Sequence, residues 1–269
     1  MIKILLNYDY SLYPYTTASY IEMASKEIEG VRCYKVNEKH PEKIDLVINI
    51  MPFDTLWSWK RAPSCYWEID CHMIQGSKSE YYNAVDKVYI AQSHYLDLYP
   101  LEKTSYLPLA CAPSVHKRSE HVKQNYDIGF LGNDTYPDRR MLLDQLQENY
   151  HILRSTGIYG PAYSKELSKC MMIFNMSMLH DVNMRFFEGM AIGRLLLTDY
   201  LPEQDEFATP GIHYEIYKDF PELKKKIDYY IEYPALRERI ALQGSRNIRQ
   251  NHTYKHRLIK ILQDFNLIK

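Results

Sequence analysis

Apolar residues recur along the first half of this chain in two alternating patterns. Short apolar runs are typical of strands buried in a parallel sheet, and apolar positions spaced three to four residues apart are typical of helices. The expected strands are Ile2–Leu6, Val31–Val36, Asp45–Ile50, Ser64–Ile69, Lys87–Ala91 and Thr104–Pro108. The expected helices are Ala18–Glu29, Ser77–Ala84 and Ser93–Tyr99. This alternation predicts a parallel sheet covered by helices.

The same alternation restarts after a polar stretch, His116–Asn125, which is typical of a connector. The expected strands are Asp127–Leu131, one near Ile152, Met171–Met176, Leu195–Leu197 and His213–Tyr217. The expected helices are Pro137–Asn149, one that follows the Gly157–Pro161 turn, one that follows Asn183, Pro221–Tyr233, Pro234–Asn251 and Tyr254–Phe265. We therefore predict an α/β protein with two Rossmann-like domains, residues 1–118 and 119–251, and a terminal helix in residues 252–269.

Residues 183–199 form the most informative stretch, because they predict a helix that leads into a buried strand. Asn183 is a favourable N-cap residue and Gly193 lies where a C-terminal cap belongs. Arg185 and Glu188 share one helix face at i and i+3. Such a pair is suited to gripping a sugar nucleotide, with the cation on the phosphates and the carboxylate on the ribose. The simpler interpretation is a solvated ion pair worth a few tenths of a kcal/mol, roughly.

Several segments, taken in order, resemble one protein family. RFFEGMAIG at 185–193, LLLTD at 195–199 and HTYKHR at 252–257 resemble the C-terminal half of the spore-maturation-type glycosyltransferases, which belong to the GT-B superfamily with the retaining group 1 enzymes. LPLACAPSVH at 107–116, YDIGFLGN at 126–133 and YWEID at 66–70 also resemble segments of that family.

The resemblance implies the GT-B fold, in which two Rossmann-like domains face each other across a cleft and the terminal helix commonly crosses back to the first domain. It also implies transfer of a sugar, with retention, from a nucleotide-diphosphate sugar, a UDP-sugar first among the candidates. Glu188 matches the ribose-binding glutamate of many retaining enzymes. The donor-sugar glutamate expected eight positions earlier is replaced by His180. Either His180 or Asp181 replaces it, or backbone amides serve, and a core or capping role for His180 is equally compatible.

Three loops in the second half follow predicted strands, where parallel sheets bind ligands. Gly132 and Asn133 precede a helix whose first turn carries Arg139 and Arg140. This arrangement suits a diphosphate held by backbone amides and an arginine. The simpler interpretation is an ordinary strand-to-helix turn with a surface basic pair, since the loop is not a GxGxxG motif. The second loop is residues 177–183. The third contains Thr198 and Asp199, and Asp199 has turn capping as its simpler role.

The first half offers a second set of polar residues at strand ends. Asp70 and His72 follow the Ser64–Ile69 strand, and we expect His72 to contact a sugar or acceptor hydroxyl and Asp70 to orient it. The simpler interpretation makes Asp70 a cap and Trp67 a core residue, and we assign Trp67 no catalytic role. Residues 7–9 also end a strand on the expected acceptor side.

Composition narrows the class of protein. The net charge of −1 gives no overall attraction to DNA or membranes. The odd number of cysteines, five, without a CxxC pair, is typical of reduced thiols in the cytoplasm. The sequence holds no paired zinc ligands and no DxD triplet, and its apolar runs lead us to expect neither a signal peptide nor a membrane span. We therefore expect a metal-independent enzyme without a cofactor, with leaving-group charge met by Arg185 and helix N-termini.

Two rival functions remain compatible with the sequence. One is a DNA-modifying glucosyltransferase of viral type, against which the near-neutral charge argues. The other is a non-catalytic module that binds nucleotide sugars, which the missing first glutamate favours. The acceptor, a glycan, protein, small molecule or DNA, is not written in the sequence.

Overall fold

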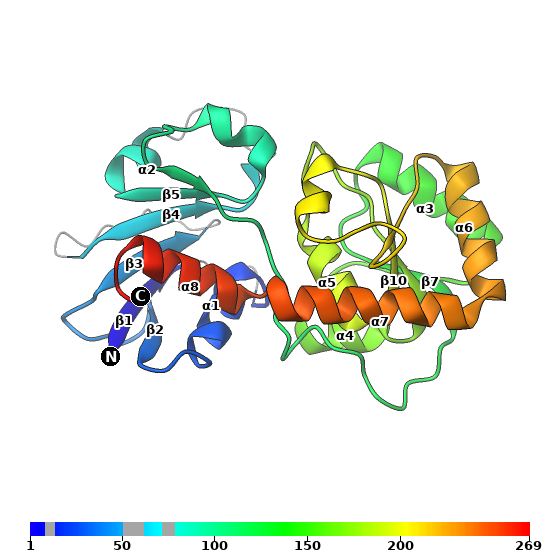
Figure 1. The fold of residues 1–269 in the computed structure, drawn as a ribbon, viewed down its shortest axis with the longest axis horizontal. Coiled ribbons are helices and arrows are strands. Elements are labelled where there is room, and N and C mark those ends of the chain that lie inside the picture. The colour runs from blue at the N-terminus through cyan, green and yellow to red at the C-terminus, as the bar shows by residue number, and fades with distance from the viewer. Residues whose placement is uncertain (9–13, 51–61, 72–78) are drawn as a thin grey trace. The chain divides into compact units, whose positions relative to one another are not determined.

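The computed structural model describes residues 1–8, 14–50, 62–71 and 79–269, and these form two compact units. Unit 1 comprises residues 1–110, 179–181 and 254–269, and unit 2 comprises residues 111–178 and 182–253 (Figure 1). Residues 111–118, which the sequence analysis assigned to the first domain, lie in unit 2. The terminal helix belongs to unit 1, so the chain crosses back to the unit in which it began.

Unit 1 is built on a six-stranded parallel sheet with the strand order β2-β1-β3-β4-β5-β6. The strands are β1 Ile2–Asn7, β2 Val31–Lys35, β3 Leu46–Ile50, β4 Ser64–Glu68, β5 Lys87–Ile90 and β6 Thr104–Tyr106. The helices are α1 Thr17–Ser25, α2 Ser79–Ala84, the 3-10 helix η2 Ser93–Leu98 and α8 Tyr254–Asp264. Helices α1 and α8 pack against each other, and the Tyr20 and Tyr254 rings lie 5.3 Å apart.

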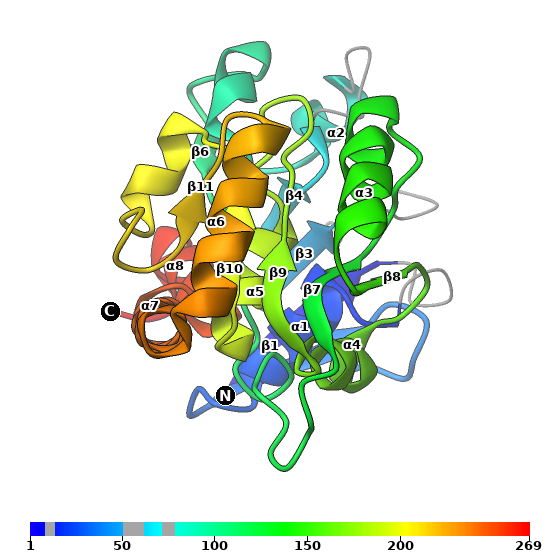
Figure 2. The same cartoon turned by 90° about the vertical axis from the view of Figure 1, so that its right-hand side faces the viewer.

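Unit 2 holds a five-stranded parallel sheet with the strand order β11-β10-β9-β7-β8. Its strands are β7 Tyr126–Leu131, β8 Ile152–Ser155, β9 Cys170–Phe174, β10 Leu195–Thr198 and β11 Glu215–Ile216. Its helices are α3 Pro137–Asn149, α4 Gly160–Leu167, α5 Met184–Ile192, the 3-10 helix η3 Pro202–Glu206, α6 Phe220–Glu232 and α7 Pro234–Asn251. Figure 2 shows α3 and α6 over one face of this sheet.

Strand alternation explains how the sheet of unit 2 is covered. Phe130, Phe174 and Leu197 belong to a buried cluster with residues of α3 and α6. Their neighbours face the other way: a Cβ at Gly129 would lie 3.0 Å from Leu167 of α4, and one at Gly189 of α5 the same distance from Leu196. Successive residues of a strand point to opposite faces, so both faces are apolar and buried.

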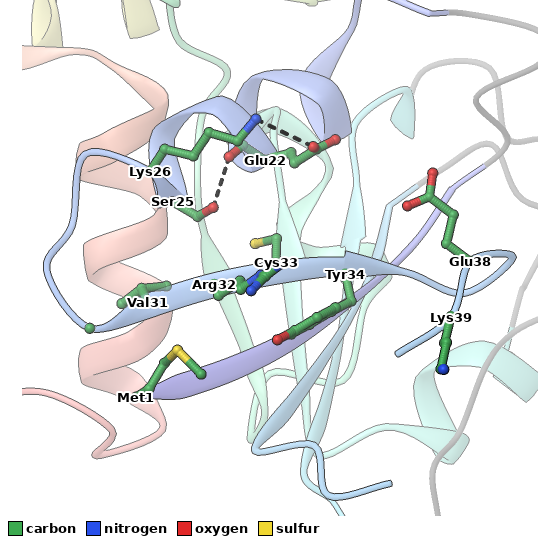
Figure 3. A pocket seen from close by; sticks show the side chains of 11 residues that line it. Met1, Glu22, Ser25, Lys26, Val31, Arg32, Cys33, Tyr34, Glu38 and Lys39 are labelled. Carbon is green, nitrogen blue, oxygen red and sulfur yellow. Dashed lines mark hydrogen bonds and ion pairs between the residues drawn. The ribbon is translucent and has the colours of Figure 1, made fainter. Parts of the chain in front are cut away.

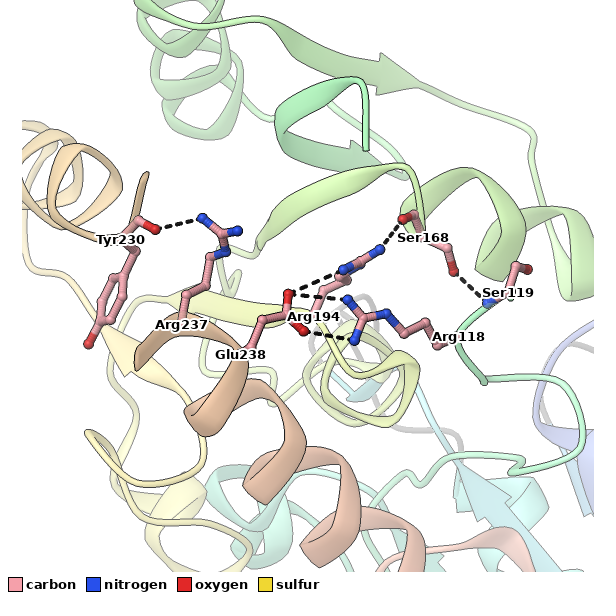
Figure 4. A network of polar contacts seen from close by, with 7 residues as sticks. All are labelled: Arg118, Ser119, Ser168, Arg194, Tyr230, Arg237 and Glu238. Carbon is pink, nitrogen blue, oxygen red and sulfur yellow. Dashed lines mark hydrogen bonds and ion pairs between the residues drawn. The ribbon is translucent and has the colours of Figure 1, made fainter. Parts of the chain in front are cut away.

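An ionic network braces the frame of unit 2 (Figure 4). Glu238 of α7 accepts two hydrogen bonds from Arg118, at 2.8 and 3.1 Å, and one from Arg194. Arg194, which directly precedes β10, also donates to the carbonyl of Ser168, whose hydroxyl accepts a bond from the Ser119 amide at 2.9 Å. The network therefore ties residues 118–119 and the start of β10 to α7.

Several predicted elements differ from the observed ones. The expected Ser93–Tyr99 helix is a 3-10 helix, the expected His213–Tyr217 strand shrinks to Glu215–Ile216, and η3 was not predicted. The expected Ala18–Glu29 helix ends at Ser25, and the residues up to Gly30 form turns. The five cysteines are free, and all but Cys33 are buried. No helix in the described parts of the chain combines the length and the apolar character needed to cross a membrane.

Candidate active site

Side-chain hydrogen bonds hold Arg185 at the carboxyl ends of β7 and β9 in unit 2. Its Nε and NH2 groups donate to the carbonyl of Leu131, which ends β7, at 3.2 and 3.0 Å. Its NH1 group donates to Asn175 Oδ1 at 3.0 Å, and the guanidinium carbon lies 4.4 Å from the centre of the Phe130 ring. A guanidinium has five N–H donors, so these bonds leave donors on NH1 and NH2 for a further partner.

Asn175 directly follows β9 and connects Arg185 to the end of the neighbouring strand, β10. Its Nδ2 donates to the Thr198 hydroxyl at 3.0 Å, and that hydroxyl donates to Asp199 Oδ1 at 3.1 Å. Asp199 Oδ1 also accepts the Ser177 amide at 2.7 Å. The network thus joins the ends of β7, β9 and β10 through Arg185, Asn175 and Thr198. Asn175 was not predicted as a site residue, because the apolar pattern predicted a strand through Met176, whereas β9 ends at Phe174.

Gly132 allows Arg185 to approach the chain after β7. A Cβ at Gly132 would lie 2.0 Å from Arg185 NH2, closer than real Cβ atoms come to any atom, and Gly132 has a φ of +152°. Any larger residue at position 132 would therefore displace the guanidinium and strain the backbone.

Arg139 holds the loop at Gly132 and Asn133, which the sequence predicted to bind a diphosphate. Arg139 is buried and donates from NH1 to the Asn133 carbonyl and from NH2 to the Met176 carbonyl, both at 2.8 Å. The Asn133 side chain accepts the Thr135 amide at 2.8 Å, as in an Asx turn. Arg140 is exposed and donates to the Asp134 carbonyl. Arg139 thus joins two loops, and its contact with a diphosphate stays a prediction.

Glu188 lies one helical turn after Arg185 and is 8% exposed. Its Oε1 lies 3.2 Å from His116 Nε2. Burial raises the pKa of Glu188 to about 7, whereas the charge of Arg185 and the Tyr163 hydroxyl act to lower it. Because Glu188 is buried beside a histidine, it is not the solvated surface ion-pair partner of the simpler interpretation.

The start and end of α5 follow the predicted signals with one difference. Gly193 adopts the left-handed conformation that ends the helix, with a φ of +81°. Asn183 takes the N-cap position, but its side chain makes no capping bond and instead donates weakly to the Met176 carbonyl at 3.5 Å. The Asn183 Oδ1 atom is buried without a hydrogen-bond partner among the described residues.

The segment Leu179–Asp181 lies within unit 1. The His180 ring is exposed and stacks on the His94 ring, with ring centres 4.0 Å apart. Tyr95 donates to the Leu179 carbonyl at 2.6 Å, and Gln92 donates to Asp181 Oδ1 at 2.7 Å. The core or capping role considered for His180 is wrong, because an exposed ring outside any helix end performs neither. Its sugar-binding role stays a prediction.

The end of β4 carries Trp67 and Glu68, and Asp70 follows it. Trp67 is fully buried and donates to the Leu107 carbonyl at 3.0 Å, as expected for a core residue. Asp70 is exposed, and its amide donates to Glu68 Oε1 at 3.3 Å. Glu68 is fully buried and accepts a bond from the Tyr66 hydroxyl. His72 and Asp9 lie outside the described residues.

A surface pocket of about 550 Å³ lies elsewhere in unit 1, between α1 and β2 (Figure 3). Its lining runs along β2, from Gly30 and Val31 at one end to Glu38 and Lys39 beyond the other. Because β2 is an edge strand of the sheet and none of the predicted site residues lines this pocket, the pocket is not part of the candidate site. Within the described ranges, no group of three or more His, Cys, Asp or Glu side chains is arranged to hold a metal ion.

Two parallel sheets with helices on their faces, a terminal helix that returns to the first unit and polar groups at the strand ends are features of the GT-B glycosyltransferase fold. Residues 117–263, more than half of the chain, match the glycosyl transferase-like family. The chain belongs to this family and is a glycosyltransferase. A comparison with curated proteins finds no match.

Solved structures agree on the fold. HepE of Anabaena, solved in complex with UDP and glucose, has a TM-score of 0.68 at 12% identity, with 100% of both chains covered. A glycosyltransferase from Rickettsia africae has a TM-score of 0.64 at 13% identity, covering 99% of this chain and 98% of its own. A DNA-modifying β-glucosyltransferase has a TM-score of 0.66 at 11% identity, covering 98% of this chain and 100% of its own. At identities of 11–13%, these TM-scores show a shared fold alone.

Proposed function

We propose that this protein transfers a sugar from UDP to an acceptor hydroxyl, with retention at the sugar carbon and without a metal ion. The observation that carries the proposal is Arg185, held at the ends of β7 and β9 by Leu131 and Asn175 beside the start of α5. A fixed cation at a helix N-terminus suits a diphosphate. The complex of HepE with UDP and glucose supports UDP as the nucleotide, and the five free cysteines support work in the cytoplasm.

Arg185 acts on the departing group in this proposal. The bond between the sugar carbon and the diphosphate oxygen breaks, the acceptor oxygen bonds to that carbon and gives its proton to His72, and negative charge grows on the diphosphate. The guanidinium is already oriented, so it stabilises that charge without reorganisation. Gly132, Asn133, Arg139, Asn183 and Thr198 line or brace the same strand ends, and Glu188 receives hydrogen bonds from the ribose.

The sugar and acceptor contacts are assigned to His180 and to the group after β4. His72 exchanges a proton with a hydroxyl, and Asp70 orients it. Asp70→Asn and His72→Ala should therefore leave UDP affinity nearly unchanged while lowering the rate of transfer. Normal transfer by both variants would remove these residues from the proposal.

The decisive experiment is a thermal-shift screen with UDP- and other nucleotide-sugars, followed by turnover of the best donor. A ligand that binds only the native state raises the melting temperature. At a ligand concentration of a hundred times Kd, the free energy of unfolding rises by about 2.7 kcal/mol. Transfer of a labelled sugar, including transfer to duplex DNA as one acceptor, separates an enzyme from a binding module. Activity should persist in EDTA, and loss restored by manganese would overturn the metal-free part of the proposal.

A further inference from the structure

A chain of hydrogen bonds connects Asp199, at the end of β10, to the guanidinium of Arg185. Arg185 NH1 donates to Asn175 Oδ1 at 3.0 Å. Asn175 Nδ2 donates to the Thr198 hydroxyl at 3.0 Å, and that hydroxyl donates to Asp199 Oδ1 at 3.1 Å. Asn175 and Thr198 are fully buried, so a partner lost from this hydrogen-bond chain is not replaced by bulk water.

Asp199 sets the direction of the hydrogen-bond chain. Its Oδ1 also accepts the Ser177 amide at 2.7 Å, so this oxygen serves as an acceptor. Burial raises the pKa of Asp199, but a proton taken up by the carboxyl group would go to the other oxygen, Oδ2. A hydroxyl has one proton, and Thr198 gives its proton to Asp199. The Thr198 oxygen therefore meets Asn175 as an acceptor, and the Asn175 group that faces it is the donating NH2.

This direction decides which end of the Asn175 amide meets Arg185. The oxygen and the NH2 group of a side-chain amide have nearly the same size, so shape alone does not distinguish the two orientations. With NH2 turned to Thr198, the amide oxygen faces Arg185 and accepts its NH1 proton. The reverse orientation would set the NH2 group against the donors of the guanidinium, and the bond between Asn175 and Arg185 would be lost.

The uncharged amide also preserves the charge of Arg185 for a ligand. A carboxylate at position 175 would pair with the guanidinium and compete with a diphosphate for it. Asp199 instead acts on Arg185 through two uncharged side chains, those of Thr198 and Asn175. The arrangement therefore orients a cation without neutralising it.

We propose that Asp199 is a positioning residue for the diphosphate: through the Thr198 hydroxyl it fixes the Asn175 amide with its oxygen toward Arg185. This inference rests on the proposed function. It adds to the turn-capping role that the sequence favoured for Asp199, because the oxygen that accepts the Ser177 amide also directs the hydrogen-bond chain.

The test measures the affinity for UDP by calorimetry and the affinity for uridine, which lacks the diphosphate, by competition against UDP. Thr198→Val keeps the shape of threonine without the hydroxyl. It should bind UDP roughly tenfold more weakly, with the affinity for uridine within about twofold of the wild type. Thr198→Ser restores the hydroxyl and should recover most of the loss. Asp199→Ala should show the same selective loss, and Asp199→Asn should recover part of it, because its amide oxygen can accept both bonds.

Asn175→Asp tests the direction of the hydrogen-bond chain, because it keeps an oxygen toward Arg185. Its second oxygen would face the Thr198 hydroxyl, whose proton is already given to Asp199, and its charge would pair with the guanidinium. UDP affinity should therefore fall about tenfold or more. Unchanged affinity in this variant would overturn the proposal. In an Arg185→Ala background, Thr198→Val should change UDP affinity less than about twofold, because the chain then has no cation to position.

Asp127→Ala is the matched control for Asp199→Ala. Asp127 Oδ2 accepts the amide of His151, which precedes the neighbouring strand β8, at 2.9 Å, but Asp127 lies at the amino end of β7. Its variant should bind UDP and uridine as the wild type does. If Thr198→Val also does so, or if Asp127→Ala loses UDP affinity as Asp199→Ala does, the role of Asp199 is overturned while the proposed function stands. If the wild type binds no nucleotide, the proposed function fails and this role with it.

Discussion

At the scale of single residues, Arg185 combines a fixed position with donors left for a ligand. Two strands supply its acceptors, and the Phe130 ring covers one side of its guanidinium. A cation held in this way can stabilise a diphosphate in the transition state more than in the ground state, because its orientation is complete before the charge develops.

Arg185→Ala should lower kcat about 10²–10³-fold, the usual range for removing one group that stabilises transition-state charge. Arg185→Lys should recover only part of this, because an ammonium cannot replace a planar fork bonded to both Leu131 and Asn175. Single-turnover kinetics with saturating donor provide the measurement, with circular dichroism as the control for folding. Full kcat in the alanine variant would contradict the assignment.

Glu188 gives a pH-dependent prediction for stability. Its pKa of about 7 in the folded protein exceeds the ordinary value of 4.5, so the folded state binds more protons than the unfolded state between these values. The stability contributed by Glu188 therefore falls as pH rises from about 4.5 to 7. The stability contributed by His116 instead rises with pH below pH 6.5, because its pKa is lowered. This contribution cancels when the wild type is compared with a variant that changes only Glu188.

The free energy of unfolding of the wild type, minus that of Glu188→Gln, should fall by up to about 3 kcal/mol over this pH range. Glutamine has nearly the size and shape of the neutral glutamic acid, so the comparison isolates the ionisation. Urea titrations at intervals of half a pH unit measure it. Parallel curves for the two proteins would show that Glu188 titrates normally.

At the scale of elements, the turn from β7 toward α3 and the first turn of α5 depend on each other. Gly132→Ala would place a methyl group on the Arg185 guanidinium, which must then leave its bonds to Leu131. Gly157→Ala provides a matched control, because Gly157 also has a positive φ, +71°, but no atom lies within 4 Å of its added Cβ.

Both glycine variants should lose roughly 1–3 kcal/mol from backbone strain, but only Gly132→Ala should also lose sugar transfer. Denaturant titration and a transfer assay on each variant separate the two effects. Equal activity in the two variants would mean that Arg185 tolerates displacement.

Local patterns predicted most elements of this protein because strands and caps are marked by nearby residues. Helix Pro137–Asn149 begins with proline, and Gly193 ends α5 as its sequence indicates. The partners of the site were harder to predict. Nothing in the sequence beside Glu188 shows that His116, 72 positions earlier, meets it. Asn175 carries one usable signal, an amide at the end of an apolar run, which the prediction took for strand.

At the scale of the whole molecule, α8 is part of unit 1 although it follows unit 2 in the chain. Leu258 is fully buried, and Arg257 donates to the carbonyls of Pro108 and Leu109 at 2.8 and 3.0 Å. The Thr17 hydroxyl lies 3.3 Å from that of Tyr254. These contacts make the helix part of the core of the unit.

Leu258→Ala should destabilise unit 1 by about 2–5 kcal/mol, the usual cost of a cavity left by leucine. All three tryptophans lie among the first 110 residues, so tryptophan fluorescence during denaturation reports unit 1. Its midpoint should fall in this variant. Leu242→Ala, at an exposed position of α7, serves as control and should leave the midpoint unchanged. An unchanged midpoint in Leu258→Ala would show that α8 contributes little to the core of unit 1.

The return of α8 also has a consequence for synthesis of the chain on the ribosome. Tyr254 is made 237 residues after its partner Thr17, a delay of roughly 10–50 s at ordinary rates of translation. During that interval the face of α1 that α8 will cover is exposed, while residues 111–253 can emerge and fold as unit 2. Unit 1 therefore begins first and is completed after unit 2, and a chaperone that shields apolar surface would act on this protein before residues 254–269 appear.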